Sequence, residues 1–423
     1  MDDDKLLEIK DLHLHFHTYG GTVKALRGVN LAIKHGETLG LVGESGCGKS
    51  QTAMSLLQLT PKPPAEYPQG EILYHRKVGR GSERKWIDIL RLPEPDLRRI
   101  RGNDISMIFQ EPMTSLNPVL PCGEQICEVI VQHQDVGVKL RAWDRFWLRR
   151  GFKTRRYGKA LEGAAPRAIG MLRDIGIPDP EGLMERYPHE LSGGMRQRVM
   201  IAIGLSCDPD LLVADEPTTA LDVTIQAQIM DLMRSLKTRV GASILLITHH
   251  LGVVAEMADR IAVMYAGRIV EEGPAVDVFK APKHPYTLGL LNSIPDLKGG
   301  SEEGGADGAD AGAPAVQTAQ ERSRRRRDLP VIPGTVPNLL NPPAGCSYHP
   351  RCPFAFERCR VKVPELQKAE GQMVACHLYD PDITVPAALR NKDASVYLRP
   401  PGADGFNPNP TVKESDLGGR AEA

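Results

Sequence analysis

Eight consecutive residues, 43–50, have the types and spacing of a phosphate-binding loop. They fit the pattern G-x-x-x-x-G-K-[ST], in which glycines let backbone N–H groups turn inward around a phosphate. Lys49 would reach the β- and γ-phosphates of a nucleotide, and the Ser50 hydroxyl would bind Mg²⁺. We therefore expect a nucleotide to be bound by the loop and the residue after it: Gly43, Glu44, Ser45, Gly46, Cys47, Gly48, Lys49, Ser50 and Gln51.

Two adjacent carboxylates supply the next reactive groups. Asp215 and Glu216 follow four apolar residues, 211–214, that predict a buried strand. A carboxylate at such a strand end helps to hold Mg²⁺ beside a phosphate loop, and we assign this role to Asp215. Glu216 would act as general base on water. The alternative is a pair of exposed loop acids, which the apolar run disfavours.

Gln110 and His249 follow two further predicted strands, at 105–109 and 243–247. A polar residue at the carboxyl end of a strand lies where open α/β sheets bind ligands. A His there can hydrogen-bond a phosphate, whereas an isolated His is more often structural. Together with the loop and the carboxylates, these groups make up the set that nucleotide hydrolysis requires: phosphate clamp, Mg²⁺ site, positioned water and γ-phosphate sensor.

One edge of one sheet must bring these side chains together. A strand at 38–42 and a helix at 51–57 flank the loop, which is the context that the motif needs. Two short strands at 261–264 and 268–271 close the unit. A second helix begins at Ser192-Gly193-Gly194, where its N-terminus could hold an anion. Taken alone, these three residues indicate only a capped helix.

The N-terminal region predicts an antiparallel pair of strands. Residues 7–10 and 29–33 alternate apolar and polar side chains around a turn at 19–22. An aromatic side chain here could stack on a purine, with Tyr19 as the first candidate and Phe16 as the second. The alternative is an aromatic side chain that packs at a strand end.

Composition indicates a globular protein of two or three domains. The 423 residues are 25% charged and 41% hydrophobic, with a formal net charge of zero, which gives no reason to expect nucleic acid as a partner. There is no apolar run of about 18 residues, and the acidic N-terminus lacks the apolar region of a secretory signal. We therefore expect a cytoplasmic protein whose eight cysteines are thiols or metal ligands rather than disulfides.

Residues 1–275 resemble the nucleotide-binding domain of ATP-binding-cassette (ABC) transporters. Six motifs occur in order: Walker A at 43–50, the Q-loop at Gln110, the signature at 191–197, Walker B at 211–216, the D-loop at 220–222 and the switch histidine at His249. The resemblance implies an α/β P-loop NTPase core with an antiparallel β subdomain and a helical subdomain at about 111–200.

The same resemblance implies the ligands, ATP and Mg²⁺. It places Gln110 with Ser50 and Asp215 at the metal, and Asp222 at the nucleotide. His250 departs from the family, where an Asp commonly follows the switch histidine, and we expect little effect from this change.

A head-to-tail dimer also follows from the resemblance. Ser192, Gly193 and Gly194 of one subunit would complete the ATP site on the Walker A motif of the other. Gln110 and the helical region after it would contact membrane-spanning partners. The protein would then be peripheral, on the cytoplasmic face of the inner membrane.

Residues 109–118, the stretch His284-Pro285-Tyr286-Thr287 and the later cysteines resemble the oligopeptide/dipeptide importer branch. In that branch two different ATPase subunits usually serve two permeases and an extracytoplasmic peptide-binding protein, which implies a heterodimer and a peptide cargo. Nickel, glutathione, murein peptides and sugars are alternative cargoes. A soluble cassette ATPase of translation or DNA repair, or a regulatory module without hydrolysis, are competing classes. The chain has one cassette and no heptads, which disfavours the translation and repair classes. The presence of both Asp215 and Glu216 disfavours a module without hydrolysis.

The composition changes after residue 275. Residues 276–297 extend the cassette, and 298–328 are rich in Gly, Ala, Asp and Glu before four arginines, which is typical of a disordered linker. A Pro-rich, Cys-rich module follows at 329–380. The remaining residues, 381–423, form a Pro- and Gly-rich tail.

Four of the cysteines lie in this module with the spacing C-x5-C-x6-C-x16-C: Cys346, Cys352, Cys359 and Cys376. So small a module cannot bury much core, and a metal would help to hold it together. Thiolates favour zinc or iron–sulfur. Structural zinc sites usually show tight C-x₂₋₄-C pairs, which are missing here, whereas a [4Fe–4S] cluster accepts looser spacing. The importer resemblance also implies that cluster. We favour a structural cluster over zinc, with unligated thiols third.

Two stretches look like additions to the cassette. Residues 139–156, within a mainly helical region at 119–190, combine eight Lys and Arg with four aromatic residues. Such a mixture favours contact with lipid headgroups or a permease loop, and a solvated insert is the alternative. Residues 60–103 are Pro-rich and then basic, and we expect them to be surface elaboration.

Overall fold

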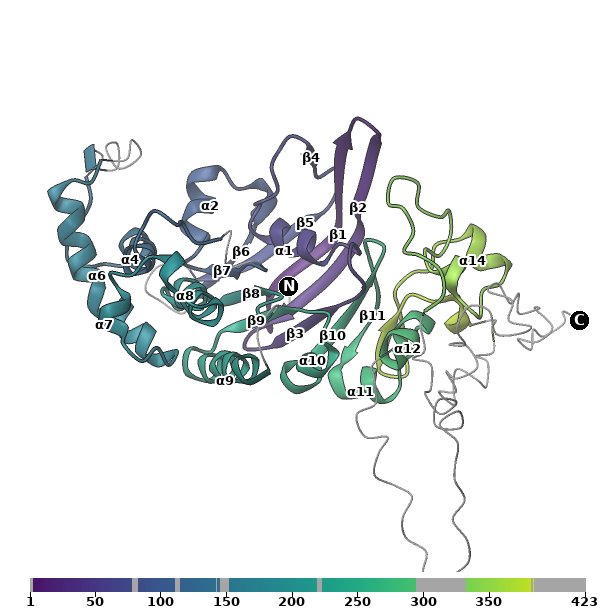
Figure 1. Ribbon diagram of the computed structural model, residues 1–423. Helices are drawn as coiled ribbons and strands as arrows, with labels where there is room; N and C mark the ends of the chain where they lie inside the picture. Colours follow the sequence, from purple (N-terminus) through teal and green to yellow (C-terminus); the bar gives the residue numbers. More distant parts are fainter. Residues whose placement is uncertain are drawn as a thin grey trace, which may run out of the picture. The chain divides into compact units, whose positions relative to one another are not determined.

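The computed structural model describes residues 3–77, 83–110, 115–141, 143–144, 152–218, 223–293, 332–381 and 383. It divides into two compact units, which are residues 1–275 with 339–341 and residues 276–338 with 342–423 (Figure 1). The linker predicted at 298–328 and nearly all of the tail predicted at 381–423 lie outside the described residues.

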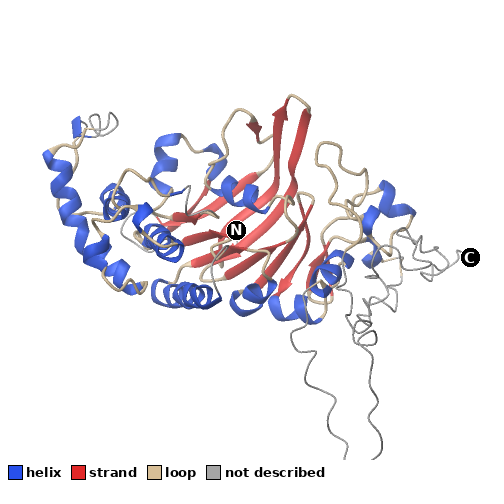
Figure 2. Ribbon diagram, in the orientation of Figure 1, coloured by secondary structure: helices blue, strands red, loops and turns tan. Residues whose placement is uncertain are grey.

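An antiparallel sheet forms one layer of the first unit (Figure 2). Its strand order is β2-β1-β5-β6, with β4 also paired to β1. The two strands predicted at 7–10 and 29–33 are parts of a hairpin of 14-residue strands, whose inward apolar side chains include Leu12, Leu14 and Leu26. The strands are β1 (Lys5–Thr18), β2 (Gly21–Lys34), β4 (Ala65–Glu66), β5 (Glu71–Lys77) and β6 (Arg84–Asp88).

The described part of residues 60–103 supplies β4, β5 and β6 of this sheet, so the prediction of a surface elaboration is wrong. Besides three strands they form η1 (Ile89–Arg91) and α2 (Glu94–Ile100). Ile72 and Tyr74 are fully buried, and Tyr74 lies opposite Leu7 of β1. The strands are short and lie in a Pro-rich and then basic stretch of sequence. Their apolar residues therefore do not form a recognisable strand pattern in the sequence.

A mostly parallel sheet forms the second layer of this unit. Within this unit its described strands run in the order β11-β10-β3-β9-β8-β7, and among these six only the β10–β11 pair is antiparallel. Every residue of β3, β8 and β9 is buried, as expected for strands covered on both faces. The strands are β3 (Thr38–Val42), β7 (Ile105–Ile108), β8 (Leu211–Asp215), β9 (Ser243–Ile247), β10 (Arg260–Tyr265) and β11 (Arg268–Pro274).

Two apolar clusters hold the first unit together. One lies between the two sheets, and the other lies between the parallel sheet and the helices α4, α6, α8 and α9. Besides η1 and α2, the described helices of the unit are α1 (Lys49–Leu56), α4 (Cys122–His133), α6 (Arg155–Asp174), α7 (Pro180–Leu183), η2 (Pro188–Glu190), α8 (Gly193–Leu205), α9 (Val223–Val240) and α10 (Leu251–Met257). Among the helices of the described residues, none is both long and apolar enough to cross a membrane.

The second unit is small and has few regular elements. His284 caps α12 by accepting a hydrogen bond from the Tyr286 N–H at 3.0 Å. Tyr348 packs against the rings of both His284 and Tyr286. After α11 (Ala275–Lys280), which begins at the boundary, the elements are α12 (Pro285–Asn292), η3 (His349–Arg351), α14 (Glu357–Val361), β12 (Gln367–Ala369), β13 (Gln372–Val374) and η4 (His377–Tyr379).

Candidate active site

The phosphate loop connects the buried end of β3 to the start of α1, as its sequence predicts. Gly43 has φ 153°, and a Cβ there would lie 2.2 Å from the Met264 carbonyl oxygen. Gly48 caps α1 in the left-handed region, so both positions require glycine. The buried Lys49 Nζ donates to the carbonyl oxygens of Gly43 at 2.8 Å and Glu44 at 3.0 Å. The loop therefore folds around this ammonium group.

Asp215 lies at the end of β8 against the same loop. Its side chain is buried and hydrogen-bonded to Ser50. Burial raises the pKa of Asp215, and this effect is opposed by the Ser50 hydrogen bond and the charge of Lys49. Among the described residues, its buried Oδ1 has no hydrogen-bond partner. An unpaired carboxylate oxygen beside a hydroxyl fits a divalent cation, since Mg²⁺ takes oxygen ligands.

Glu216 is held between residues from two neighbouring strand ends. Gln110 Nε2 donates to its Oε2 at 3.0 Å, and His249 Nδ1 lies 3.1 Å from its Oε1. Its backbone adopts φ 48°, which is uncommon for a residue with a side chain, and its N–H donates to the Ile247 carbonyl at 2.8 Å. The structure thus brings Glu216, Gln110 and His249 together at one sheet edge. The described contact of Gln110 is with Glu216, and its role as a Mg²⁺ ligand stays a prediction.

Gln197, predicted only as the last residue of the signature, also supports the Glu216 turn, a role that sequence reasoning missed. It lies on α8, is 2% exposed, and its Nε2 donates to the carbonyl oxygen of Pro217, directly after Glu216. One buried amide therefore fixes the turn that carries the carboxylate. The signal available in the sequence was a polar residue within an otherwise apolar helix face.

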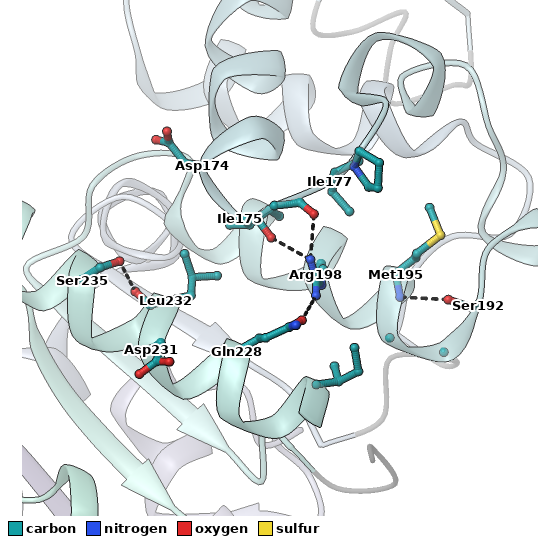
Figure 3. A pocket seen from close by; sticks show the side chains of 15 residues that line it. Asp174, Ile175, Ile177, Ser192, Met195, Arg198, Gln228, Asp231, Leu232 and Ser235 are labelled. Carbon is teal, nitrogen blue, oxygen red and sulfur yellow. Dashed lines mark hydrogen bonds between the residues drawn. The ribbon is translucent and has the colours of Figure 1, made fainter. Parts of the chain in front are cut away.

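The signature residues line a different hollow, of about 1140 Å³ (Figure 3). Ser192 caps α8 by accepting the Met195 N–H at 3.3 Å, and Gly193 and Gly194 leave the helix end open. Arg198 donates to the carbonyl oxygens of Ile175 and Gly176, which end α6, and so joins the two helices. The described lining comes from α6, α8 and α9 and the segments next to them, and includes no phosphate-loop residue.

Three further predicted residues have different outcomes. His250 accepts the Val253 N–H at 3.3 Å and caps α10, which explains how the fold uses the residue that departs from the family pattern. Tyr19 is fully exposed at the tip of the β1–β2 hairpin, so stacking on a purine remains a prediction. Asp222 lies outside the described residues.

The four clustered cysteines all belong to the second unit, where Cys352, Cys359 and Cys376 are buried and Cys346 is partly exposed. Burial raises the pKa of Cys352 and Cys376 well above the usual value, and repulsion from the other thiols adds to this. The Cys346 N–H donates to the Cys359 carbonyl at 2.8 Å, which joins two of the segments. Among the residues that the structure describes, no three His, Cys, Asp or Glu side chains are grouped closely enough to hold a metal ion.

Known proteins match the chain over most of its length. The ABC transporter family model matches residues 26–219, and the model of the oligopeptide/dipeptide transporter C-terminal region matches 270–321 and 315–359. The probable peptide ABC transporter ATP-binding protein y4tR of Sinorhizobium fredii is 46% identical over 374 residues, which cover 88% of this chain and 95% of that protein.

Two relatives from Bacillus subtilis are similar at nearly the same level. The oligopeptide transport ATP-binding protein OppD is 43% identical, covering 92% of this chain and 94% of that protein. The dipeptide transport ATP-binding protein DppD is 42% identical, covering 89% and 96% respectively. Since this identity spans nearly the whole of each relative, the chain belongs to the ATP-binding proteins of ABC transporters, in the branch with the oligopeptide/dipeptide transporter C-terminal region.

Proposed function

We propose that this chain is the ATP-hydrolysing, energy-coupling subunit of an importer for di- and oligopeptides. The observation that carries the proposal is the Glu216 carboxylate, set between Gln110 and His249 beside the phosphate loop. The relatives named for peptide, oligopeptide and dipeptide transport support the cargo, and they favour transport over translation or DNA repair.

In this proposal each side chain at the sheet edge has one task. Lys49 and the loop N–H groups bind the β- and γ-phosphates, while Ser50 and Asp215 would hold Mg²⁺, which would neutralise charge on those phosphates. Glu216 Oε1 or Oε2 accepts the proton of the attacking water. His249 contacts the γ-phosphate, and Gln110 orients the carboxylate. Tyr19 stacks on the adenine.

A second cassette subunit completes the site. The signature residues Ser192, Gly193 and Gly194 line a hollow without the phosphate loop, which supports their acting on ATP bound to a partner subunit. We infer a heterodimer that works with two permeases and an extracytoplasmic peptide-binding protein. The chain would then lie on the cytoplasmic face of the inner membrane.

We further propose a [4Fe–4S] cluster on Cys346, Cys352, Cys359 and Cys376. The mutual electrostatic influence of these buried thiols supports it, because a cationic cluster would turn repulsion between thiolates into attraction. A cluster would bind the four segments of this small unit together, so its role would be structural.

Substitution of Glu216 tests the ATPase assignment. Glu216→Gln keeps Lys49, Ser50 and Asp215, so ATP binding should persist while turnover falls by about a thousandfold or more. The measurements are ATP titration and phosphate release by the subunit assembled with its permeases, and peptide uptake into proteoliposomes identifies the cargo. Hydrolysis near the native rate would refute the role of Glu216, and uptake of nickel or sugars but no peptide would refute the cargo.

Anaerobic purification tests the cluster. The protein should be brown and hold about four iron per chain. Any one of the four cysteines changed to Ser should remove the colour, whereas the control Cys207→Ser, a buried thiol in the first unit, should not. One zinc per chain in a colourless protein would overturn the iron–sulfur assignment, and a protein free of metal would overturn the metal site.

A further inference from the structure

A second hollow, of about 820 Å³, lies at the N-terminal end of α6 and is strongly cationic. Eight described residues line it, of which five carry a positive charge and none a carboxylate. The charged residues are Lys139, Arg141, Arg155, Arg156 and Lys159. We call this set the cationic hollow.

The hollow is lined by two segments, residues 137–141 and residues 155–159, and one buried carboxylate connects them. Asp144 accepts the Arg141 N–H at 2.9 Å and the Thr154 hydroxyl at 2.9 Å. The hydrogen bond from the Arg141 N–H is the main reason why the pKa of Asp144 is low, and the charges of Arg156 and Arg141 contribute less. Asp144 thus balances at most one of the five cations, because its oxygens are used in the fold.

The position of these cations is unfavourable for the protein alone. Arg155 and Arg156 are in the first turn of α6, a 20-residue helix with no acidic residue in that turn. The N-terminus of a helix carries a partial positive charge and favours anions. Within the described part of the chain, none of the five side chains forms a direct ion pair, whereas the adjacent Lys153 pairs with Glu124 at 2.6 Å. An external anion would relieve this accumulation of charge.

Two large aromatic side chains are exposed beside the hollow. Trp143 is 66% exposed and directly precedes Asp144, and Phe152 is 60% exposed two residues before Thr154. The Asp144–Thr154 hydrogen bond therefore brings the segments that carry them together. Cations next to exposed aromatic rings are the combination found where proteins contact the interface of a bilayer.

We infer that the cationic hollow, with Trp143 and Phe152, is a docking surface for an anionic lipid leaflet. The lipid phosphates lie against the five cations, and the two rings enter the headgroup region. A free phosphate would satisfy the charge but leave both rings in water, so a leaflet fits the whole surface better. The subunit then touches the bilayer directly, independently of the permeases and of the ATPase assignment.

Vesicle binding by the purified full-length chain tests this inference. At low salt the chain should bind vesicles of phosphatidylcholine mixed with phosphatidylglycerol, and not vesicles of phosphatidylcholine alone. Each cation near an anionic surface contributes about fivefold in binding. The triple variant Arg155→Gln, Arg156→Gln, Lys159→Gln should therefore bind on the order of 100-fold more weakly. Added salt should also weaken the binding of the native protein to these vesicles.

A matched variant separates this surface from overall charge. Arg91→Gln, Arg98→Gln, Arg99→Gln removes the same charge from exposed arginines of η1 and α2, and it should bind like the native protein. Equal loss in both triple variants, or no loss in either, would overturn the inference. Trp143→Ala with Phe152→Ala should also weaken binding. If it does not, and inorganic phosphate displaces the vesicles at constant ionic strength, the hollow binds free anions instead of a leaflet.

Discussion

Replacing Gln197 by Met should slow ATP hydrolysis without weakening ATP binding. Gln197 is buried, and its Nε2 is the donor to the Pro217 carbonyl oxygen next to Glu216. Met has a similar length but no N–H, so it would leave that carbonyl unsatisfied in the folded protein. The same α8 carries the signature residues at its N-terminus, so one helix contacts both the hollow in Figure 3 and the Glu216 turn.

The size of the effect follows from the cost of the lost hydrogen bond. An unsatisfied buried carbonyl costs about 1–3 kcal/mol. The turn can avoid this cost by moving toward water, which takes Glu216 out of its position. At about 1.4 kcal/mol for each factor of ten, kcat should fall by about 10- to 100-fold. The KM for ATP should change by less than about threefold, because Lys49 and the loop remain in place.

Steady-state phosphate release by the assembled transporter measures both constants. Gln372→Met is a matched control, since Gln372 is also 2% exposed and donates to a backbone carbonyl, that of Ala281, at 3.0 Å in the second unit. Gln372→Met should lower the melting temperature by about as much as Gln197→Met does, but it should leave kcat unchanged. The reasoning would be refuted if Gln197→Met kept the native kcat, or if both variants lost activity in proportion to stability.

Three other perturbations have expected outcomes. Lys49→Ala should weaken ATP binding by about 10- to 100-fold in a nucleotide titration, because charge-assisted hydrogen bonds to the phosphates are lost; native affinity would contradict the role of Lys49. Burial lowers the pKa of His284 to about 3, below its unfolded value of about 6.5. Between these two pKa values only the unfolded chain binds a proton at this residue. The His284 contribution to the free energy of unfolding should therefore be complete above pH 6.5, and below it the free energy of unfolding should fall by up to about 1.4 kcal/mol per pH unit. His284→Asn, which keeps a cap acceptor, should reduce this slope in thermal melts, and an unchanged slope would count against it. Arg260 contacts Glu37 at 2.8 Å and also pairs with Glu272. Arg260→Met should therefore cost about 3 kcal/mol in urea unfolding, since two mostly buried carboxylates lose their cation; a loss below about 0.5 kcal/mol would show the pair to be unimportant.

Sequence alone predicted which groups meet at the candidate ATP site. The spacing of residues 43–50 and the polar residues after three apolar runs were enough to predict that Glu216, Gln110 and His249 meet at one edge. The prediction is possible because parallel strands end at a common edge of the sheet. Residues that directly follow such strands therefore lie close together in space, although they are far apart in the sequence. Short buried strands such as β3, β8 and β9 are also evident locally, since each is mostly apolar.

Tertiary structure alone decided which side chains support that chemistry. Gln197 meets a carbonyl 20 residues away, and only the packing of α8 against the turn after β8 puts them in contact. His250 caps a helix, and β5 buries its central residues against β1, through partners that no local pattern specifies. The cationic hollow arises in the same way, because Asp144 joins two segments whose charges the sequence shows only as a basic stretch. Hydrogen bonds and burial between distant segments depend on how the layers pack, and local periodicity contains no information about that packing.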